Sequence, residues 1–366
     1  MAADILRLAN PGVQGLSPYQ PGKPIEELER EYGVSNAIKL ASNENPLGPS
    51  PRALEAAQKA LRDINRYPDG NGFALKQALA RKHGVAPDHI TLGNGSNDIL
   101  EFLARAFVQP ENEVVFSDHA FAVYPIVTRA VGAKPVVTPA KNWGHDLAAM
   151  RAAVNARTRL VFIANPNNPT GTWLKAGELE AFIQALPAHV IVAVDEAYFE
   201  YVEEREYPDT IAWSAKYPNL VTTRTFSKAY GLAGLRAGYA VSSPQMADVL
   251  NRVRQPFNVN SIALAAAAAA LSDELHVKRA VQANREGMQL LVGAFQSLGL
   301  KFIPSVGNFV CVDFGRPAAP VYEALLREGV IVRPVANYGM PNHLRVTIGL
   351  PEENARFLEA LKRVLR

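Results

Sequence analysis

The fold of this chain is indicated most clearly by one stretch of sequence, Leu160-Val161-Phe162-Ile163-Ala164-Asn165-Pro166-Asn167-Asn168-Pro169-Thr170-Gly171. Its first five residues are apolar on both faces, which is typical of a strand in a sheet that is covered on both sides. Asparagines, prolines and a glycine then follow, and these residues favour a turn. Because parallel sheets bind ligands at the carboxyl ends of their strands, this change from apolar to polar residues predicts a binding edge.

Similar short apolar runs occur on both sides of this stretch, separated by helical segments or loops. One of them, Val190-Ile191-Val192-Ala193-Val194, is again apolar on both faces. Strands that alternate with helices in this way predict an α/β fold with a mostly parallel, doubly wound sheet. Strands are expected at 113–116, 134–137, 159–164, 189–194, 220–223 and 237–241, and helices from Pro51, over 72–83 and from about Ile99.

The sequence pattern changes towards both ends of the chain. Residues 1–49 are rich in proline, glycine and asparagine and are expected to form an N-terminal arm and loop. Residues 50–257 carry the alternating pattern and are predicted to form a large domain that contains this binding edge. Residues 258–366 predict a smaller α/β domain, with helices over 263–271 and 277–298, strands at 309–313, 330–333 and 343–348, and a closing helix from Pro351.

The composition is that of an ordinary globular protein. The 366 residues are 48% hydrophobic and 20% charged, with a net charge of +3, so neither nucleic acid nor a membrane surface is expected as a partner. The single cysteine, Cys311, lies in an apolar run and is expected to be a buried thiol, not part of a disulfide or a metal cluster. No signal peptide is recognisable after Met1, and the apolar run 262–271 is too short to span a bilayer, so a cytoplasmic protein is expected.

Polar residues also follow two other predicted strands. One strand leads into Asp195-Glu196-Ala197-Tyr198, and another into Arg224-Thr225-Phe226-Ser227-Lys228. In addition, Gly93-Asn94-Gly95-Ser96-Asn97-Asp98 precedes a predicted helix, where free backbone N–H groups favour a phosphate. A phosphate cradle, a carboxylate and a lysine at neighbouring strand ends are what pyridoxal phosphate needs.

Each of these signals also has a purely structural interpretation. Asp195 could cap a helix, Lys228 could be a solvated surface lysine, and the glycine-rich segment could be only a turn. Their joint position at neighbouring strand ends is what favours the cofactor.

The motifs resemble those of a known family. Ser227-Lys228 followed by Gly231-Leu232-Ala233-Gly234-Leu235-Arg236 is similar to the lysine segment of fold-type I pyridoxal-phosphate-dependent aminotransferases. The segments 168–171 and 195–198 match two further signatures of that family, in the same order along the chain. Within the family, four segments resemble the histidinol-phosphate aminotransferases: Ser17-Pro18-Tyr19-Gln20-Pro21-Gly22, Asn43-Glu44-Asn45-Pro46, Arg66-Tyr67-Pro68-Asp69 and His343-Leu344-Arg345-Val346-Thr347.

This resemblance implies a role for each matching residue. Lys228 would hold the cofactor covalently and move a proton on the substrate, and Asp195 would keep the pyridine nitrogen charged. Asn168 and Tyr198 would form hydrogen bonds to the cofactor's phenolic oxygen. Phe121 would stack on the cofactor ring.

The same resemblance implies a phosphate site and a homodimer. Tyr67 would reach the phosphate from the partner subunit. The other phosphate-binding residues would be Ser96, Asn97, Thr225, Ser227 and Arg236.

Three of these assignments have alternatives. Aromatic residues beside strands commonly belong to the core, so Tyr124 could stack on the ring in place of Phe121. The family commonly has tyrosine at the position of Phe121, whose missing hydroxyl removes a hydrogen bond. Arg236 could lie on a surface helix, and Tyr67 could only pack at an interface.

The substrate end of the site is predicted from two arginines near the C-terminus. Arg345 matches the family's arginine for the substrate carboxylate, and a guanidinium suits that planar anion. A phosphate ester is larger and more charged, so a second cation, Arg333, is a candidate, with a hydrogen bond from Tyr19. Arg333 could instead be a structural surface arginine.

The resemblance implies amino transfer from L-glutamate to imidazole acetol phosphate, which gives L-histidinol phosphate and 2-oxoglutarate in histidine biosynthesis. Two other enzymes share the scaffold: an aromatic amino acid (phenylalanine or tyrosine) aminotransferase and a threonine-phosphate-type decarboxylase. A ligand sensor fused to a DNA-binding module is disfavoured, because a basic helix-turn-helix pattern is missing.

Overall fold

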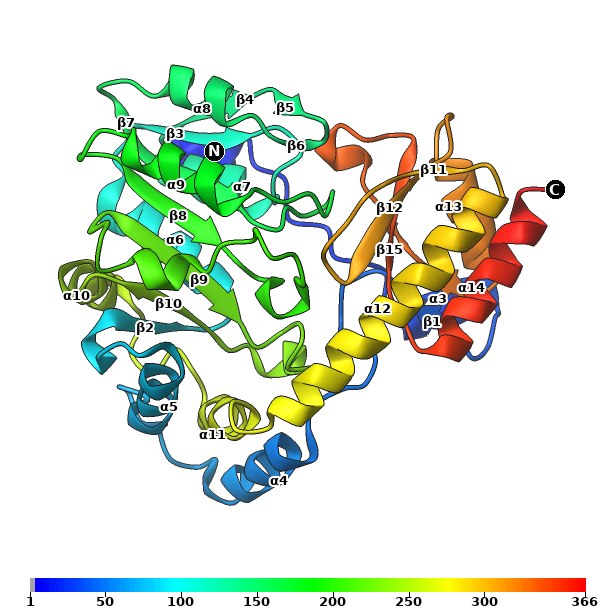
Figure 1. Cartoon of the computed structure of the whole chain (residues 1–366), viewed down its shortest axis with the longest axis horizontal. Helices are drawn as coiled ribbons and strands as arrows, with labels where there is room; N and C mark the ends of the chain where they lie inside the picture. The colour runs from blue at the N-terminus through cyan, green and yellow to red at the C-terminus, as the bar shows by residue number, and fades with distance from the viewer. Residues whose placement is uncertain (1–3) are drawn as a thin grey trace.

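A mostly parallel sheet of seven strands forms the larger body of the protein, in a computed structural model that describes residues 4–366 (Figure 1). The strand order is β2-β10-β9-β8-β7-β3-β4. β10 is antiparallel to both of its neighbours, and the strands from β9 to β4 are parallel to one another. The strands are β2 (Ile90–Gly93), β3 (Glu113–Ser117), β4 (Lys134–Thr138), β7 (Thr158–Ala164), β8 (Ile191–Asp195), β9 (Leu220–Thr225) and β10 (Gly238–Ser242). The predicted doubly wound α/β sheet is thereby confirmed.

Helices cover both faces of this sheet. In β7, Leu160 and Phe162 pack with α6 (Ser96–Phe107), α7 (Val123–Ala130) and α10 (Pro244–Val253). Val161 and Ile163 point to the other face and pack with α8 (Leu147–Ala153) and α9 (Ala176–Gln184). The alternation of side chains along a strand explains why this segment is apolar at every position.

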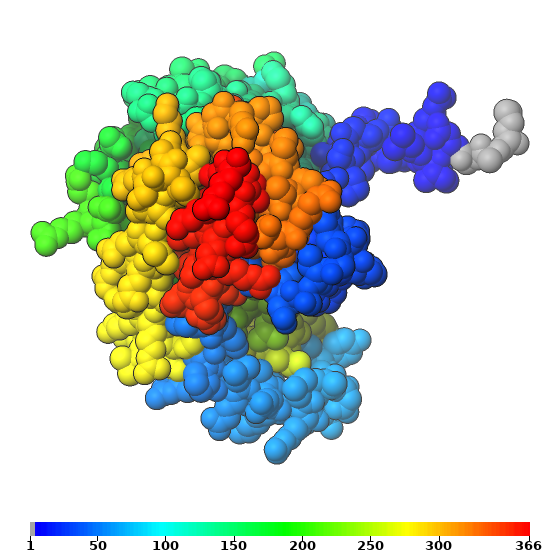
Figure 2. All heavy atoms as spheres, turned by 90° about the vertical axis from the view of Figure 1, so that its right-hand side faces the viewer, coloured from blue at the N-terminus to red at the C-terminus, as the bar shows by residue number. Residues whose placement is uncertain are grey.

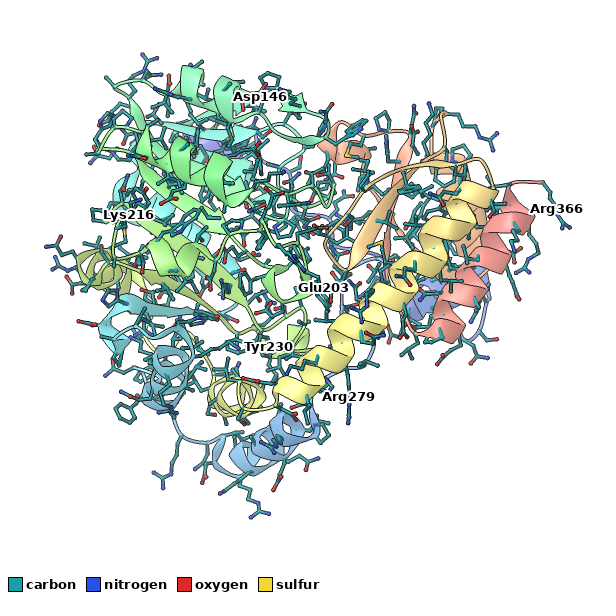
Figure 3. All side chains as sticks on the ribbon, viewed as in Figure 1. Asp146, Glu203, Lys216, Tyr230, Arg279 and Arg366 are labelled. Carbon is teal, nitrogen blue, oxygen red and sulfur yellow. The ribbon has the colours of Figure 1, made fainter. Side chains whose placement is uncertain are left out.

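A smaller antiparallel sheet, in the order β11-β12-β15-β14, lies beside the larger one. Its strands are β11 (Lys301–Ile303), β12 (Phe309–Asp313), β14 (Arg333–Pro334) and β15 (His343–Thr347), and it packs against α12 (Glu274–Ser297), α13 (Ala319–Arg327) and α14 (Pro351–Val364). The long helix α12 runs from α11 to this sheet (Figure 1). Arg285 of α12 pairs at 2.9 Å with Glu203, which lies next to the helix in Figure 3.

The first 49 residues are more structured than the sequence suggested. They contain helix α3 (Ile25–Tyr32) and strand β1 (Ile38–Lys39), which pairs in parallel with β13 (Val330–Ile331). The signal for α3 was present: Ile25, Leu28 and Tyr32 lie on one helix face, and Gly33 ends the helix at φ +65°. The surrounding prolines and glycines obscured this pattern.

Two other predicted boundaries are wrong. The strand expected over 330–333 is split into β13, which joins β1, and β14, which joins the antiparallel sheet. Helix α6 begins at Ser96, a turn before the predicted Ile99, because Gly95 adopts φ +79° and closes the loop there.

The remaining elements are short or peripheral. Helices α4 (Pro51–Ala60), α5 (Phe73–His83) and α11 (Ser261–Ala270) pack around one end of the larger sheet. The others are α1 (Ile5–Leu8), α2 (Pro11–Gln14), β5 (Ala140–Lys141), β6 (Gly144–His145) and 3₁₀ turns at Leu61–Asp63, Pro87–His89, Phe199–Tyr201, Thr210–Trp213, Ala233–Leu235 and Ala336–Tyr338. In residues 4–366, every helix is too short or too polar to cross a membrane.

Candidate active site

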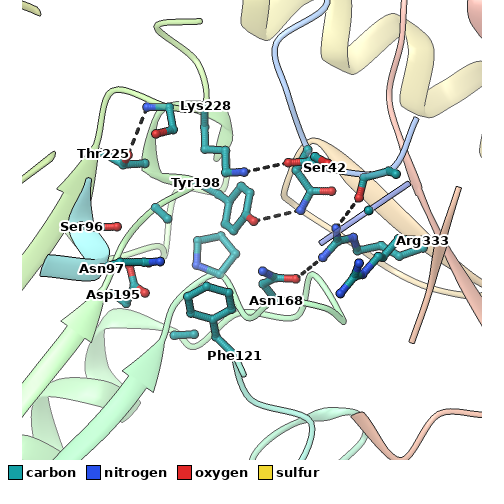
Figure 4. Close-up of a pocket in the computed structure, with 18 of the residues that line it drawn as sticks. Ser42, Ser96, Asn97, Phe121, Asn168, Asp195, Tyr198, Thr225, Lys228 and Arg333 are labelled. Carbon is teal, nitrogen blue, oxygen red and sulfur yellow. Dashed lines mark hydrogen bonds between the residues drawn. The ribbon is translucent and has the colours of Figure 1, made fainter. Parts of the chain in front are cut away.

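A cavity of about 250 Å³ opens at the carboxyl ends of β7, β8 and β9, beside the N-terminus of α6 (Figure 4). Every predicted site residue except Tyr67 lines it. They are Tyr19, Ser96, Asn97, Phe121, Asn168, Asp195, Tyr198, Thr225, Ser227, Lys228, Arg236, Arg333 and Arg345. Strands β7, β8 and β9 are parallel neighbours, which explains why three polar segments far apart in the sequence meet here.

Lys228 follows β9 and extends into this cavity (Figure 4). Its Nζ donates a hydrogen bond of 3.0 Å to the carbonyl oxygen of Ser42 and lies 5.6 Å from the centre of the Tyr198 ring. Removal from water lowers the pKa of Lys228 to about 7, and the positive charge of Arg345 acts in the same direction. A substantial fraction of this amine is therefore uncharged and nucleophilic near neutral pH.

Asp195 ends β8 and is held by two hydroxyl groups. Tyr124 donates to Oδ2 and Thr223 donates to Oδ1, each at 3.1 Å. Burial raises the pKa of Asp195 to about 6, against the opposite effect of these hydrogen bonds. The carboxylate is thus fixed in orientation and suited to pair with a buried cation.

The structure also separates the two aromatic candidates. Tyr124 is fully buried and stacks on Phe162, with ring centres 4.6 Å apart. Phe121 lines the cavity and meets Tyr124 edge-on at 5.9 Å. Phe121 is therefore the aromatic ring available to a ligand, whereas Tyr124 supports Asp195.

The N-terminus of α6 forms a cup beside Arg236. Gly95 is the N-cap residue and has no side chain that could cap the first backbone N–H groups of α6. A Cβ atom on Gly95 would lie 2.4 Å from the guanidinium of Arg236, and one on Gly238 would lie 2.3 Å from the backbone nitrogen of Ser96. Glycine at both positions therefore keeps the cup open, and its N–H donors, hydroxyls and guanidinium fit a phosphate group.

Arg333 and Arg345 lie directly opposite each other on β14 and β15, with both side chains on one face of the sheet. They are 8% and 6% exposed, and within residues 4–366 neither pairs with a carboxylate. Arg345 donates to Asn168 Oδ1 at 2.5 Å and to the carbonyl oxygen of Ala41 at 2.6 Å. Arg333 donates to the carbonyl oxygen of Gln20 at 2.7 Å. Two buried positive charges side by side form a site for an anion.

Tyr67 lies outside this cavity. Its side chain is 83% exposed and stacks on Phe257, with ring centres 4.8 Å apart. Within one chain it therefore contributes nothing to the site.

Among the groups that contact the predicted site residues, sequence reasoning missed Ser42, Asn43, Tyr124 as a hydrogen-bond donor, and Thr223. Asn43 lies in the quoted segment 43–46, but no role followed from that motif. Thr223 ends the predicted strand 220–223, and it lies beside Asp195 because the two are register partners on β9 and β8, a pairing that the strand pattern alone does not give. Ser42 contacts Lys228 through its backbone carbonyl oxygen, a group that every residue has, so the residue type at this position gave no signal.

Comparison with known proteins agrees with this geometry. The family model described as aminotransferase class I and II matches residues 35–361. The chain is 65% identical to histidinol-phosphate aminotransferase 2 of Pseudomonas fluorescens Pf-5, over 100% of this chain and 99% of that protein. It is 62% identical to histidinol-phosphate aminotransferase 1 of Nitrosococcus oceani, over 98% and 97% of the two chains.

A solved structure is similar over nearly the whole fold. The histidinol-phosphate aminotransferase of Sinorhizobium meliloti, crystallised with pyridoxal-5'-phosphate, superposes with a TM-score of 0.90 at 34% identity, and 97% of each chain is covered. The family model, the high identity over full length and the shared fold lead to one conclusion: the chain belongs to the class I and II aminotransferases of fold type I, among the histidinol-phosphate aminotransferases.

Proposed function

We propose that this enzyme transfers the amino group of L-glutamate to imidazole acetol phosphate, giving L-histidinol phosphate and 2-oxoglutarate, with pyridoxal phosphate as cofactor. The observation that carries this proposal is the pair Arg333 and Arg345, two buried cations that face one cavity without a carboxylate partner in the described chain. A phosphate ester brings two negative charges to them, which matches their combined charge.

The cavity fits pyridoxal phosphate. The cup at the start of α6, with Arg236, Thr225 and Ser227, would hold the phosphate, and Asp195 would hold the ring nitrogen. Phe121 would cover one face of the ring. When bound, the cofactor supplies an electron sink that stabilises negative charge on the substrate carbon bearing the amino group.

The chain's own residues handle the proton and the substrate. With a pKa of about 7, Lys228 Nζ can accept the proton from that carbon near neutral pH and return it. Arg345 and Arg333 bind and orient the anionic end, and Tyr19, whose ring lies 5.7 Å from the Arg333 guanidinium, adds a hydroxyl at the cavity wall. Arg345 also receives a carboxylate of glutamate, since both substrates use one site in turn.

The proposal is tested by spectral half-reactions on the purified holoenzyme. Histidinol phosphate, glutamate, phenylalanine and phosphothreonine are added separately, and the loss of the cofactor's visible absorbance is followed together with the product. Fast reaction with histidinol phosphate and glutamate and slow reaction with phenylalanine are expected. A preference for phenylalanine would instead indicate an aromatic aminotransferase, and release of carbon dioxide from phosphothreonine would indicate a decarboxylase.

We also propose a homodimer, in which Tyr67 completes the cofactor site of the partner subunit. Exposed apolar side chains gather around α4, the following loop and the start of α5: Leu54, Leu61, Ile64, Tyr67, Phe73 and Phe257. The N-terminal segment stands away from the body and carries Ile5, Leu6 and Leu8 exposed (Figure 2). Such apolar surface is typical of a contact between subunits.

Mixing two inactive variants tests this arrangement. If Tyr67 serves the partner's site, a mixed dimer of Tyr67→Ala and Lys228→Ala contains one site with both residues intact. Up to about half of the mixed dimer's sites would then regain activity. Activity that stays at the sum of the two separate variants would contradict the proposed role. The division into domains at 50–257 and 258–366 stays a prediction, which limited proteolysis near residue 257 would examine.

A further inference from the structure

The segment Asn43-Glu44-Asn45-Pro46 contains a residue that the proposed chemistry leaves without a role. Asn43 is 1% exposed, and its backbone has φ +55°, in the left-handed region. It lines the cavity next to Ser42. Asparagine tolerates this conformation better than most residues. A buried amide in this position invites the question of what it binds.

Thr347 fixes the orientation of this amide. The backbone N–H of Asn43 donates to Thr347 Oγ1 at 2.9 Å, so the hydroxyl's own hydrogen is free to go elsewhere. The Thr347 hydroxyl donates this hydrogen to Asn43 Oδ1 at 3.1 Å. Asn308 Nδ2 additionally donates to the Asn43 carbonyl oxygen at 3.0 Å. Because Oδ1 faces Thr347, the amide nitrogen must face the other way.

That nitrogen points at the cofactor site. Asn43 Nδ2 donates to the hydroxyl oxygen of Tyr198 at 2.9 Å, as the dashed line in Figure 4 shows. Tyr198 is 3% exposed and lines the cavity. In the described part of the chain no acceptor binds the hydrogen of this hydroxyl. Since the Asn43 N–H group occupies one lone pair of the Tyr198 hydroxyl oxygen, the hydroxyl hydrogen is free to point into the cavity.

We propose that Asn43 is a positioning residue, which directs the hydroxyl hydrogen of Tyr198 towards the phenolic oxygen of the bound cofactor. This inference rests on the proposed function, because it requires the cofactor's oxygen to lie beside Tyr198. A donor held in this direction stabilises the negative charge on that oxygen. It thereby lowers the pH at which the cofactor's visible absorbance changes.

Few other residues both tolerate this backbone conformation and offer a side-chain N–H donor to Tyr198. Aspartate tolerates the backbone conformation, but its carboxylate accepts hydrogen bonds and would turn the Tyr198 hydrogen away from the cofactor. Glycine keeps the conformation and deletes the amide, with no charge introduced. Asn43→Gly is therefore the cleaner test, and Asn43→Asp is the second variant.

The experiment compares Asn43→Gly with Tyr198→Phe, the double variant and a matched control. Asn45→Ala is the control, because it removes another buried amide of the same segment, which donates to the Ala229 carbonyl at 2.9 Å and, within residues 4–366, forms no hydrogen bond to Tyr198. Two quantities are measured: the pH midpoint of the visible absorbance of the loaded protein, and the affinity of the apoprotein for pyridoxal phosphate.

Tyr198→Phe is expected to raise the midpoint by about one pH unit and to weaken cofactor binding by about tenfold, the scale of one hydrogen bond to a charged group. Asn43→Gly is expected to shift both quantities in the same direction, and the double variant to shift them no further than Tyr198→Phe alone. Asn45→Ala is expected to leave the midpoint in place. Asn43→Asp should also raise the midpoint. Combining it with Tyr198→Phe should give no larger shift than Tyr198→Phe alone.

The outcomes separate two kinds of failure. If Tyr198→Phe leaves the midpoint unchanged, the role of Tyr198 in the proposed function is wrong. If Tyr198→Phe shifts it but Asn43→Gly and Asn43→Asp do not, or if the effects simply add, the positioning role of Asn43 is refuted while the proposed function stands.

Discussion

Replacing Arg333 by glutamine should separate the two anionic substrates from each other. Arg333 is 8% exposed, faces the cavity and lies opposite Arg345, so its positive charge is largely shielded from bulk solvent. In Arg333→Gln the side chain stays polar while its charge and planar fork of donors are lost. We expect a large effect on histidinol phosphate and a small one on glutamate, which retains Arg345.

The magnitude follows from the contacts. A hydrogen bond to a charged group is worth about 1.5–3 kcal/mol, which corresponds to a roughly 10- to 150-fold rise in KM for histidinol phosphate. For glutamate we expect a change within about threefold, since its carboxylate contacts are assigned to Arg345. The stability of the free protein should fall by less than about 3 kcal/mol. The 2.7 Å hydrogen bond from the charged Arg333 to the Gln20 carbonyl is worth about 1.5–3 kcal/mol, and relief of the repulsion between two opposed arginines offsets about 0.2–1 kcal/mol of its loss.

The assay measures the half-reaction with each substrate as a function of its concentration, and thermal unfolding of the apoprotein. Arg327→Gln serves as the control, because Arg327 is a mostly exposed arginine of α13 that pairs with Glu323. Equal losses for both substrates would refute the assignment of Arg333 to the phosphate. A fall of many degrees in the unfolding temperature would show instead that Arg333 is needed to hold the segment around Gln20.

Three further predictions concern the cofactor site. Lys228→Ala should abolish both turnover and the pH-dependent visible absorbance of the bound cofactor, and a variant that kept either in an absorbance titration would show that another lysine acts. Because the pKa of Lys228 is lowered to about 7, the unfolded chain binds more protons than the folded apoprotein between about pH 7 and its ordinary value of 10.5. This lysine's contribution to the free energy of unfolding should therefore rise with pH in that window, and denaturant titrations at pH 7 and 9 should show a larger rise in the wild type than in Lys228→Met. Gly95→Ala should weaken pyridoxal phosphate binding by at least tenfold in an equilibrium titration, because the added Cβ would lie 2.4 Å from the Arg236 guanidinium at a backbone φ of +79°. In contrast, Gly177→Ala, with open space around its Cβ, should bind normally.

The strand ends were predictable because one rule of the fold applies to all of them. Asn168, Asp195 and Lys228 each lie at or just beyond the end of a buried strand, and the carboxyl ends of parallel strands share one edge of the sheet. The family's motifs then supplied their roles. These three side chains could therefore be assigned to one cavity from the sequence, without any information about long-range contacts.

The contributions from other parts of the chain were harder to predict. Arg333 and Arg345 oppose each other only because of the register between β14 and β15, and the sequence around 330–333 showed one strand where two are present. Ser42 and Asn43 reach the site from a loop that β1 anchors to β13. Pairings of this kind depend on tertiary packing, which local pattern does not encode.

The pairing of β1 with β13 also has a consequence for the order of events during synthesis. Ile38 pairs with Val330, so this N-terminal strand has no partner until nearly the whole chain has been made. At about 5–20 residues per second, the wait lasts roughly 15–60 s. During that time β7, β8 and β9, with Asp195 and Lys228, can already assemble, whereas Ser42 and Asn43 have no anchored position. Lys228, the proposed catalytic lysine, can therefore enter its sheet before the wall that contacts it is anchored, and only a nearly complete polypeptide can form the whole site.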